Sequence, residues 1–244
     1  MLDRPAAVTI PLAPMLDEKA LARALSGRHF IGGSLVAARG GKTFPVVNPA
    51  TGLEIATAAE GDAADVDAAV QDAAVAQKAW ARMPARKRGA LVAACAGVIR
   101  EHVEELARLI ALETGKALRT ESRVEANTVA DVLEFFGGLG SELKGESVPF
   151  APDVLSVTVR EPLGVVGAII PWNVPMLLMA LKIAPALVAG NTVVVKSAEE
   201  APLAVLRICE LMARVLPPGA FNMLSGFGPE CGAPLVAHPL VRKV

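Results

Sequence analysis

Short β-branched runs alternate with longer apolar segments through the last part of this chain. The β-branched runs predict strands, and each apolar segment between them has the length and spacing of a helix that crosses over a sheet. The expected strands are the β-branched runs LGVVGAII (163–170) and NTVVVK (191–196), then AFNMLSG (220–226), which has no β-branched residue, and the start of another in LVRKV (240–244). This alternation predicts an α/β fold with a doubly wound parallel sheet.

The part of the chain before residue 163 has a different pattern, with helices that follow one another without a strand between them. Asp62 is a suitable N-cap for the first of these helices. They are expected at 62–80, 84–115 and about 120–136. Residues 30–52 predict two short strands around Gly40-Gly41 and then a turn at Asn48-Pro49. After a break at 149–152, residues 154–160 alternate like an exposed antiparallel strand.

Composition and charge narrow the class of function. The 244 residues are enough to bury a real core, and 53% of them are hydrophobic. The 24 basic and 25 acidic residues are mixed, and there is no tyrosine, so we expect no nucleic-acid partner. The three cysteines are far apart and odd in number, which favours reduced thiols and a cytoplasmic location. The three histidines are scattered, so we expect no metal site.

One uncharged segment, Leu163–Leu181, is long enough to cross a bilayer. However, Pro171, Asn173 and Pro175 interrupt its centre, and its character changes there from strand to helix. A buried strand followed by a buried helix accounts for both halves, so we expect no membrane partner. Residues 1–19 contain an apolar stretch that prolines break, which fits a tail and a short helix better than a signal peptide.

The ends of three expected strands carry residues that suit a ligand site. In an open parallel sheet, ligands bind beyond the C-terminal ends of the strands, so these residues are expected to lie together. They are Pro171, Trp172 and Asn173 after the first strand, Lys196 and Glu199 after the second, and Gly226, Gly228 and Gly232 after the third.

Each of these groups also has a plainer interpretation. Lys196 can donate to hydroxyls or phosphates and Glu199 can accept from two ribose hydroxyls, but the spacing also fits a solvated ion pair. The glycine spacing departs from GxGxxG, so the turn either approaches a phosphate or simply reverses the chain. Asn173 either stabilises a developing oxyanion or satisfies its own turn. Lys182, the only charge in its helix, either lies near the same site or extends to the surface.

Five stretches of the sequence resemble the NAD(P)-dependent aldehyde dehydrogenase superfamily, in the family's order and spacing from Phe30 to the last residue. They are FPVVNPATG, EPLGVVGAIIPWNVP, ALVAGNTVVVKSAEEAPL, LPPGAFNMLSGFGPECG and HPLVRKV. The visible variation is KSAE, where many members have KPSE or KPAE, and it keeps both Lys196 and Glu199. The resemblance implies a Rossmann-like domain that binds NAD, with NADP as the alternative.

The resemblance also implies a role for each candidate residue. Asn173 would be an oxyanion-hole donor. Lys196 and Glu199 would hold the adenosine ribose, and the glycine turn would lie near the adenine and the pyrophosphate. The residues expected to bind the cofactor are Ile170, Pro171, Trp172, Lys196, Glu199, Gly226, Gly228 and Gly232.

The resemblance finally implies a division of the chain. The expected parts are a tail and short helix (1–28), strands of an oligomerisation arm (29–52 and 153–160), the helical part of the cofactor-binding domain (53–152) and its Rossmann-like part (161–244). The family's nucleophilic cysteine and general-base glutamate follow the point where this sequence stops, and Cys95, Cys209 and Cys231 lack the nucleophile's sequence context. The chain alone is therefore expected to be inactive, whereas the complete enzyme would be a homo-oligomer that oxidises an aldehyde to a carboxylic acid. The alternative is a non-catalytic cofactor-binding or assembly module that another chain completes.

Overall fold

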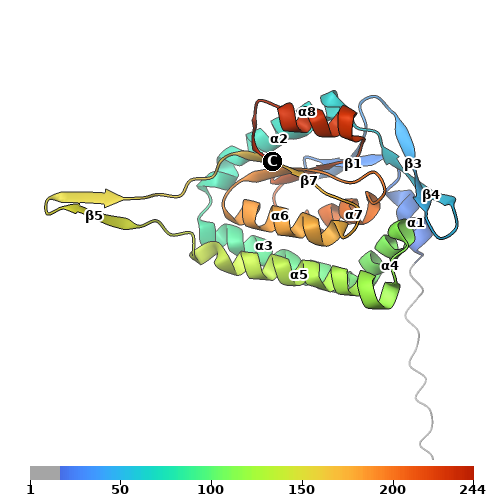
Figure 1. The fold of residues 1–244 in the computed structure, drawn as a ribbon, viewed down its shortest axis with the longest axis horizontal. Coiled ribbons are helices and arrows are strands. Elements are labelled where there is room, and N and C mark those ends of the chain that lie inside the picture. Colours follow the sequence, from blue (N-terminus) through green and yellow to red (C-terminus); the bar gives the residue numbers. More distant parts are fainter. Residues whose placement is uncertain (1–16) are drawn as a thin grey trace, which may run out of the picture.

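A six-stranded sheet forms the centre of the protein in the computed structural model, which describes residues 17–244 (Figure 1). The strand order is β10-β7-β8-β9-β1-β2, and the first four strands are parallel neighbours. The strands are β1 (Arg28–Ile31), β2 (Ser34–Ala37), β7 (Val165–Ile169), β8 (Thr192–Lys196), β9 (Phe221–Leu224) and β10 (Val241–Lys243). The expected α/β fold is confirmed, and the parallel strands are those predicted from the alternation of strands and helices. The expected tail before the first helix lies outside the described residues.

Strands β1 and β2, which come from the segment expected at residues 29–52, are part of the central sheet. Strand β1 pairs antiparallel with β9, and β2 pairs with β1 at the edge of the sheet. The reason is burial of the core, because the ring of Phe30 stacks on Phe221 with 5.4 Å between centroids. The rest of this segment forms a separate hairpin of β3 (Thr43–Asn48) and β4 (Leu53–Ala59), of which β4 falls where only helices were expected.

Helices cover both faces of the sheet (Figure 1). Helices α2 and α8 pack on one face, and α6 and α7 pack on the other, where α3, α4 and α5 form an outer layer. Their bounds are α2 (Ala63–Arg82), α3 (Ala85–Glu101), α4 (Val103–Thr114), α5 (Arg123–Gly138), α6 (Pro175–Val188), α7 (Leu203–Met212) and α8 (Ala233–Ala237). Between residues 17 and 244, no helix is both long enough and apolar enough to span a bilayer. The uncharged segment that raised this question is divided between β7 and α6, as expected.

The helices before β5 lie close to the predicted ranges, but one predicted helix is divided. The side chain of Asp62 accepts hydrogen bonds from the amides of Ala64 and Asp65, so it is the N-cap of α2 as predicted. The single helix expected at 84–115 is two helices, because His102 has φ −117° and ψ 15° and leaves the helical conformation. A short helix, α1 (Glu18–Ala24), precedes β1 as expected.

Two glycines let the outer helices α3 and α5 approach each other closely. A Cβ atom on Gly137 would lie 2.6 Å from the backbone nitrogen of Ala93, and one on Gly89 would lie 2.3 Å from the carbonyl oxygen of Gly137. Any side chain at either position would push the two helices apart. The backbones of α3 and α5 therefore lie in close contact within the helical layer that packs on α6.

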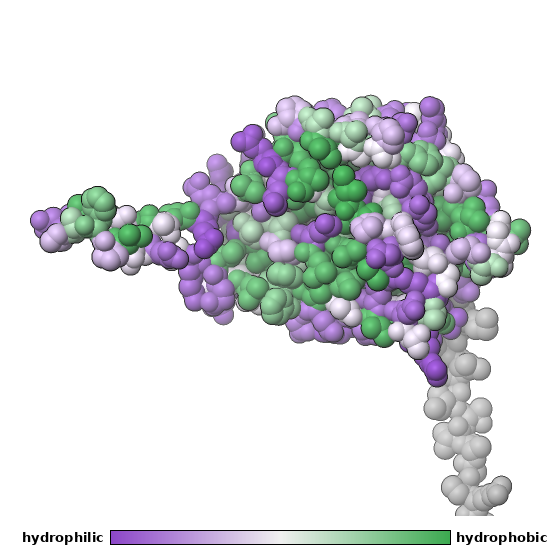
Figure 2. All heavy atoms as spheres, viewed as in Figure 1, coloured by the Kyte–Doolittle hydropathy of each residue, from purple (hydrophilic) through white to green (hydrophobic). Residues whose placement is uncertain are grey.

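A two-stranded ribbon of β5 (Ser147–Ala151) and β6 (Val154–Val157) projects away from the body (Figure 1). Strand β6 forms the first four residues of the strand predicted at 154–160, whereas β5 includes residues where a break was expected. Apolar side chains lie exposed along the ribbon among polar ones (Figure 2), and Phe150 and Leu155 are 78% and 85% exposed. The ribbon has no other strand beside it among the described residues.

Candidate functional site

The ends of three parallel strands lie in one row. Ile169 of β7 is in register with Lys196 of β8, and Lys196 is in register with Leu224 of β9. The backbone bonds continue past this row, because the amide of Ile170 donates to the carbonyl of Lys196 at 2.9 Å. The loops that carry the candidate residues therefore start side by side, as the sequence predicts for the C-terminal edge of a parallel sheet.

Lys196 and Glu199 form an ion pair in which the lysine is buried. The Nζ atom of Lys196 lies 3.1 Å from Oε1 of Glu199, and their side chains are 4% and 31% exposed. The pair is therefore not the solvated surface pair that the spacing also allowed. An ammonium has three donors, and no partner other than Glu199 occurs for it within residues 17–244. Two of its donors are therefore unpaired in this part of the chain.

In the bend between β7 and α6, the polar residue Asn173 is exposed. Ile170 is buried, whereas Pro171, Trp172 and Asn173 are exposed and Pro175 starts the helix. In the part of the chain that the structure describes, the side chain of Asn173 takes part in no hydrogen bond. Its amide is therefore not used to satisfy its own turn, which was the plainer interpretation.

The glycine turn after β9 has one glycine that packing requires and two that it does not. Gly226 has φ +146°, and a Cβ atom there would lie 2.8 Å from the carbonyl oxygen of Gly61. A Cβ atom on Gly228 or Gly232 would meet nothing within 4 Å. Instead of one regular helix, a single π-helical turn (Gly228–Gly232) and the five-residue α8 follow. Gly232 is buried, whereas Gly228 is exposed and leaves the backbone accessible from outside.

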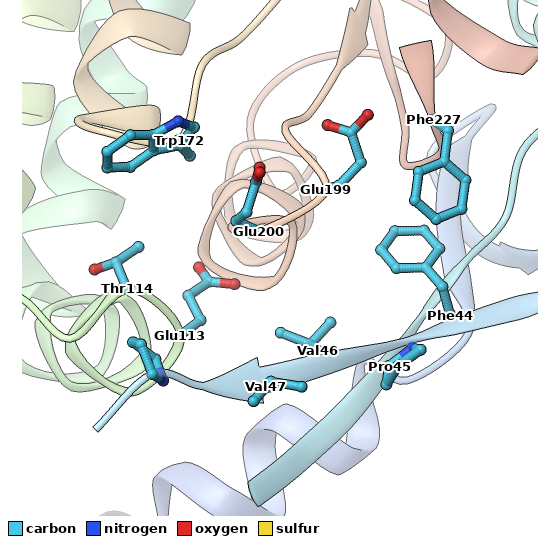
Figure 3. Close-up of a pocket in the computed structure, with 11 residues that line it drawn as sticks. Phe44, Pro45, Val46, Val47, Glu113, Thr114, Trp172, Glu199, Glu200 and Phe227 are labelled. Carbon is cyan, nitrogen blue, oxygen red and sulfur yellow. The ribbon is translucent and has the colours of Figure 1, made fainter. Parts of the chain in front are cut away.

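A cavity of about 660 Å³ lies at this edge of the sheet, a size that suits a small ligand (Figure 3). Trp172 borders one side and Phe227 the other, with Glu199 between them. Phe227 packs on Phe44 of β3 with 4.9 Å between ring centroids. The lining residues are Phe44, Pro45, Val46, Val47, Pro49, Glu113, Thr114, Trp172, Glu199, Glu200 and Phe227.

The cavity unites only some of the predicted site residues. Trp172 and Glu199 line it, and Lys196 lies against Glu199. Ile170, Pro171, Asn173 and the three glycines are not part of the lining. The wall formed by β3 and the end of α4 was not predicted as part of the site. The alternation of Phe44 and Val46, both buried, is the signal that β3 turns one face inward.

Two buried glutamates of the helical layer cap the helices that follow the site strands. Oε1 of Glu125 accepts hydrogen bonds from the amides of Met176 and Leu177 at the start of α6, and Lys116 contacts Oε2. The carboxyl group of Glu113 accepts from the amides of residues 203 and 204 at the start of α7, at 2.8 and 2.9 Å. Burial raises the pKa of Glu113 to about 8, although these two amide bonds act in the opposite direction.

The three thiols of the chain are placed away from solvent. Cys95, Cys209 and Cys231 are each fully buried. Burial raises the pKa of Cys95 and of Cys231 to about 12, and it also raises the pKa of Cys209. Such thiols are poor nucleophiles. Lys182 is exposed and lines a second cavity, of about 400 Å³, together with Lys243, so it does not belong to the site described above.

Comparison with known proteins identifies the family. A sequence profile of the aldehyde dehydrogenase family matches residues 35–244. The chain belongs to the aldehyde dehydrogenase family. Solved structures agree with this assignment: HpcC from Thermus thermophilus is 38% identical, with a TM-score of 0.89 over 92% of this chain and 44% of that one.

Two further members of the aldehyde dehydrogenase family were solved with NAD+. An aldehyde dehydrogenase from Bacillus cereus is 36% identical, with a TM-score of 0.89 over 93% of this chain and 47% of that one. Betaine aldehyde dehydrogenase from Staphylococcus aureus is 38% identical, with a TM-score of 0.88 over 92% of this chain and 45% of that one. The chain thus spans less than half the length of each of these relatives.

Proposed function

We propose that residues 17–244 form the cofactor-binding part of an NAD-dependent aldehyde dehydrogenase, which in its complete form oxidises an aldehyde to a carboxylic acid. Family membership and the two relatives that were solved with NAD+ support this proposal. Residues 161–244 would bind the cofactor, with residues 53–152 as their helical support. The ribbon around β5 and β6 would join copies of the chain into a homo-oligomer.

The buried ion pair at the end of β8 is the observation that carries the proposal. Lys196 has ammonium donors without a partner among residues 17–244, and Glu199, with which it pairs, lines a cavity of suitable size. A ribose offers neighbouring hydroxyls that both donate and accept, so the pair fits this sugar. Trp172 and Phe227 supply flat apolar walls, and the exposed Gly228 lets a phosphate approach the backbone. When bound, NAD supplies the hydride acceptor of the reaction.

Asn173 has a separate role in the proposed enzyme. Its amide is exposed and has no internal partner within residues 17–244, so it is free to donate to a negative charge that develops on an aldehyde oxygen. The nucleophile is not assigned to any residue of this chain, because Cys95, Cys209 and Cys231 are buried and have raised pKa values. A module completed by a second chain would use the same cofactor residues.

Fluorescence titration with NAD tests the proposal directly. The chain has two tryptophans, of which Trp80 is buried and Trp172 is exposed at the cavity, so bound NAD should quench Trp172. We expect saturable quenching that Trp172→Phe abolishes and that Lys196→Met shifts to at least about tenfold higher NAD concentration. Lys144→Met, at an exposed position next to the ribbon, should leave the titration unchanged. Absence of saturation at millimolar NAD, by fluorescence and by calorimetry, would refute cofactor binding by this chain.

A further inference from the structure

A fully buried histidine lies beneath the start of the glycine turn. Nδ1 of His29 in β1 is 3.2 Å from the backbone nitrogen of Ser225, the residue before Gly226. An amide N–H can only donate, so Nδ1 must accept and the ring proton must be on Nε2. Burial lowers the pKa of His29, against the opposing effect of Asp65 and Asp62, and this keeps the ring in the neutral form.

The other side of the ring has no hydrogen-bond partner among residues 17–244. Nε2 of His29 is buried and unsatisfied within this part of the chain, and Oδ2 of Asp65 lies 3.8 Å away. The carboxylate of Asp65 is held by two backbone amides, because Oδ1 accepts from Arg39 and Oδ2 accepts from Asp62. An unsatisfied buried donor destabilises a fold, and an aliphatic residue at this position would avoid that loss. The presence of a histidine at this position is therefore explained by the hydrogen bond that Nδ1 accepts from the amide of Ser225.

Ser225 is held by hydrogen bonds on each of its polar groups. Its hydroxyl donates to the carbonyl of Ala59 at 2.7 Å, and its own carbonyl accepts from the amide of Gly61 at 3.0 Å. The imidazole of His29 is the only side-chain group among these partners. Gly226 then packs directly against Gly61, and Phe227 follows at the wall of the cavity. The position of Ser225 thus sets the position of the whole turn.

We propose that His29 is a positioning residue for cofactor binding, because its unprotonated Nδ1 fixes the amide of Ser225 and hence the turn from Gly226 to Gly232. This inference rests on the proposed function, in which the turn lies against the cofactor. Without an acceptor at this point, the amide of Ser225 is buried and unpaired, and the turn loses its anchor to β1.

Three variants of His29 in the full chain separate this role from simple packing. His29→Leu removes the acceptor and fills the same space with an apolar side chain. His29→Asn places an amide oxygen at the same distance from Cβ as Nδ1, and His29→Gln places it one bond further out. The readouts are hydrogen exchange of the Ser225 and Phe227 amides by NMR and the affinity for NAD by titration.

We expect the Ser225 amide of His29→Leu to exchange at least about tenfold faster, with NAD affinity weakened about five- to tenfold. His29→Asn should restore both quantities to within about twofold of the original chain, which a purely space-filling role for the ring would not produce. His29→Gln should behave like His29→Leu, and it replaces that variant in the comparison if His29→Leu fails to fold.

Each of the following outcomes contradicts one part of the proposal about His29. Unchanged exchange at Ser225 in His29→Leu or His29→Gln, or equal behaviour of His29→Asn and His29→Leu, overturns the positioning role. Faster exchange without any change in NAD affinity limits His29 to the fold and overturns its part in cofactor binding. A chain with original sequence that binds no NAD overturns the proposed function itself, and the positioning role for the cofactor fails with it.

Discussion

The carboxylate of Glu125 lies 2.9 Å from the backbone nitrogen of Met176, at the second residue of α6. Glu125 comes from the outer helical layer, and α6 starts two residues after Asn173. A negative charge is favourable at a helix N-terminus, where amides are unpaired and the helix dipole is positive. Glu125 of the helical layer therefore fixes the place where the bend that contains Asn173 continues into α6.

Replacing Glu125 by Gln should lower the free energy of unfolding by about 1–3 kcal/mol, because the amides of Met176 and Leu177 and the ammonium of Lys116 lose a charged partner. Urea denaturation measures this change. Glu134→Gln is the matched control on the same helix, where an exposed pair with Arg100 should be worth less than about 0.5 kcal/mol. Equal losses in the two variants would contradict the capping role.

Glu113 should make stability fall as pH rises. Its unfolded carboxyl loses a proton near pH 4.5, whereas the folded one keeps it to about pH 8, so between these values the unfolded state binds fewer protons. The free energy of unfolding should therefore decrease through this window, by roughly 2–5 kcal/mol, and level off outside it. Glu113→Gln, which has no proton to lose, should show a flatter profile in urea denaturation at a series of pH values. Parallel profiles for the two proteins would exclude a raised pKa.

Glu199 should make the protein prefer NAD over NADP. A carboxylate beside the ribose repels the additional phosphate of NADP, and two like charges at about 4 Å cost on the order of 4 kcal/mol at an intermediate dielectric. Because the Glu199 side chain is 31% exposed, we expect a smaller effect, with NAD bound about tenfold more tightly. Titrations with both cofactors measure the ratio, which Glu199→Gln should reduce. Glu101→Gln, at an exposed position outside the cavity lining, is the control and should leave the ratio unchanged. Equal or tighter binding of NADP to the original chain would contradict this assignment.

The projecting ribbon should make the chain self-associate. Strands β5 and β6 expose apolar side chains and unpaired edges, which are the features that a second copy can cover. We expect light scattering to show a mass above that of the 25.2 kDa monomer, and the double variant Phe150→Ser, Leu155→Ser to restore the monomer. Val75→Ser, at an apolar position of α2 that is 72% exposed, is the control and should not change the mass. A monomeric original chain at high concentration would rule out the ribbon as a contact.

The sequence predicts where the parallel strands lie, and for β7 and β8 the signal is a β-branched run that a buried strand favours. It does not predict that β1 joins the same sheet, since that depends on the contact of Phe30 with Phe221, far away along the chain. The β3 wall of the cavity is missed for the same reason. The burial of Lys196 also could not be read from its spacing to Glu199, because tertiary packing alone removes a lysine from water.

The row formed by Ile169, Lys196 and Leu224 has a consequence for how such a chain can vary. Successive residues of a strand point to opposite faces and advance by about 3.3 Å, so losing one residue from β8 would both retract the ammonium and turn it to the other face. Exchanging one β-branched residue for another at Val193, Val194 or Val195 would do neither. Insertions and deletions are therefore expected in the loops beyond the row. The number of residues in each strand before the row is expected to stay the same.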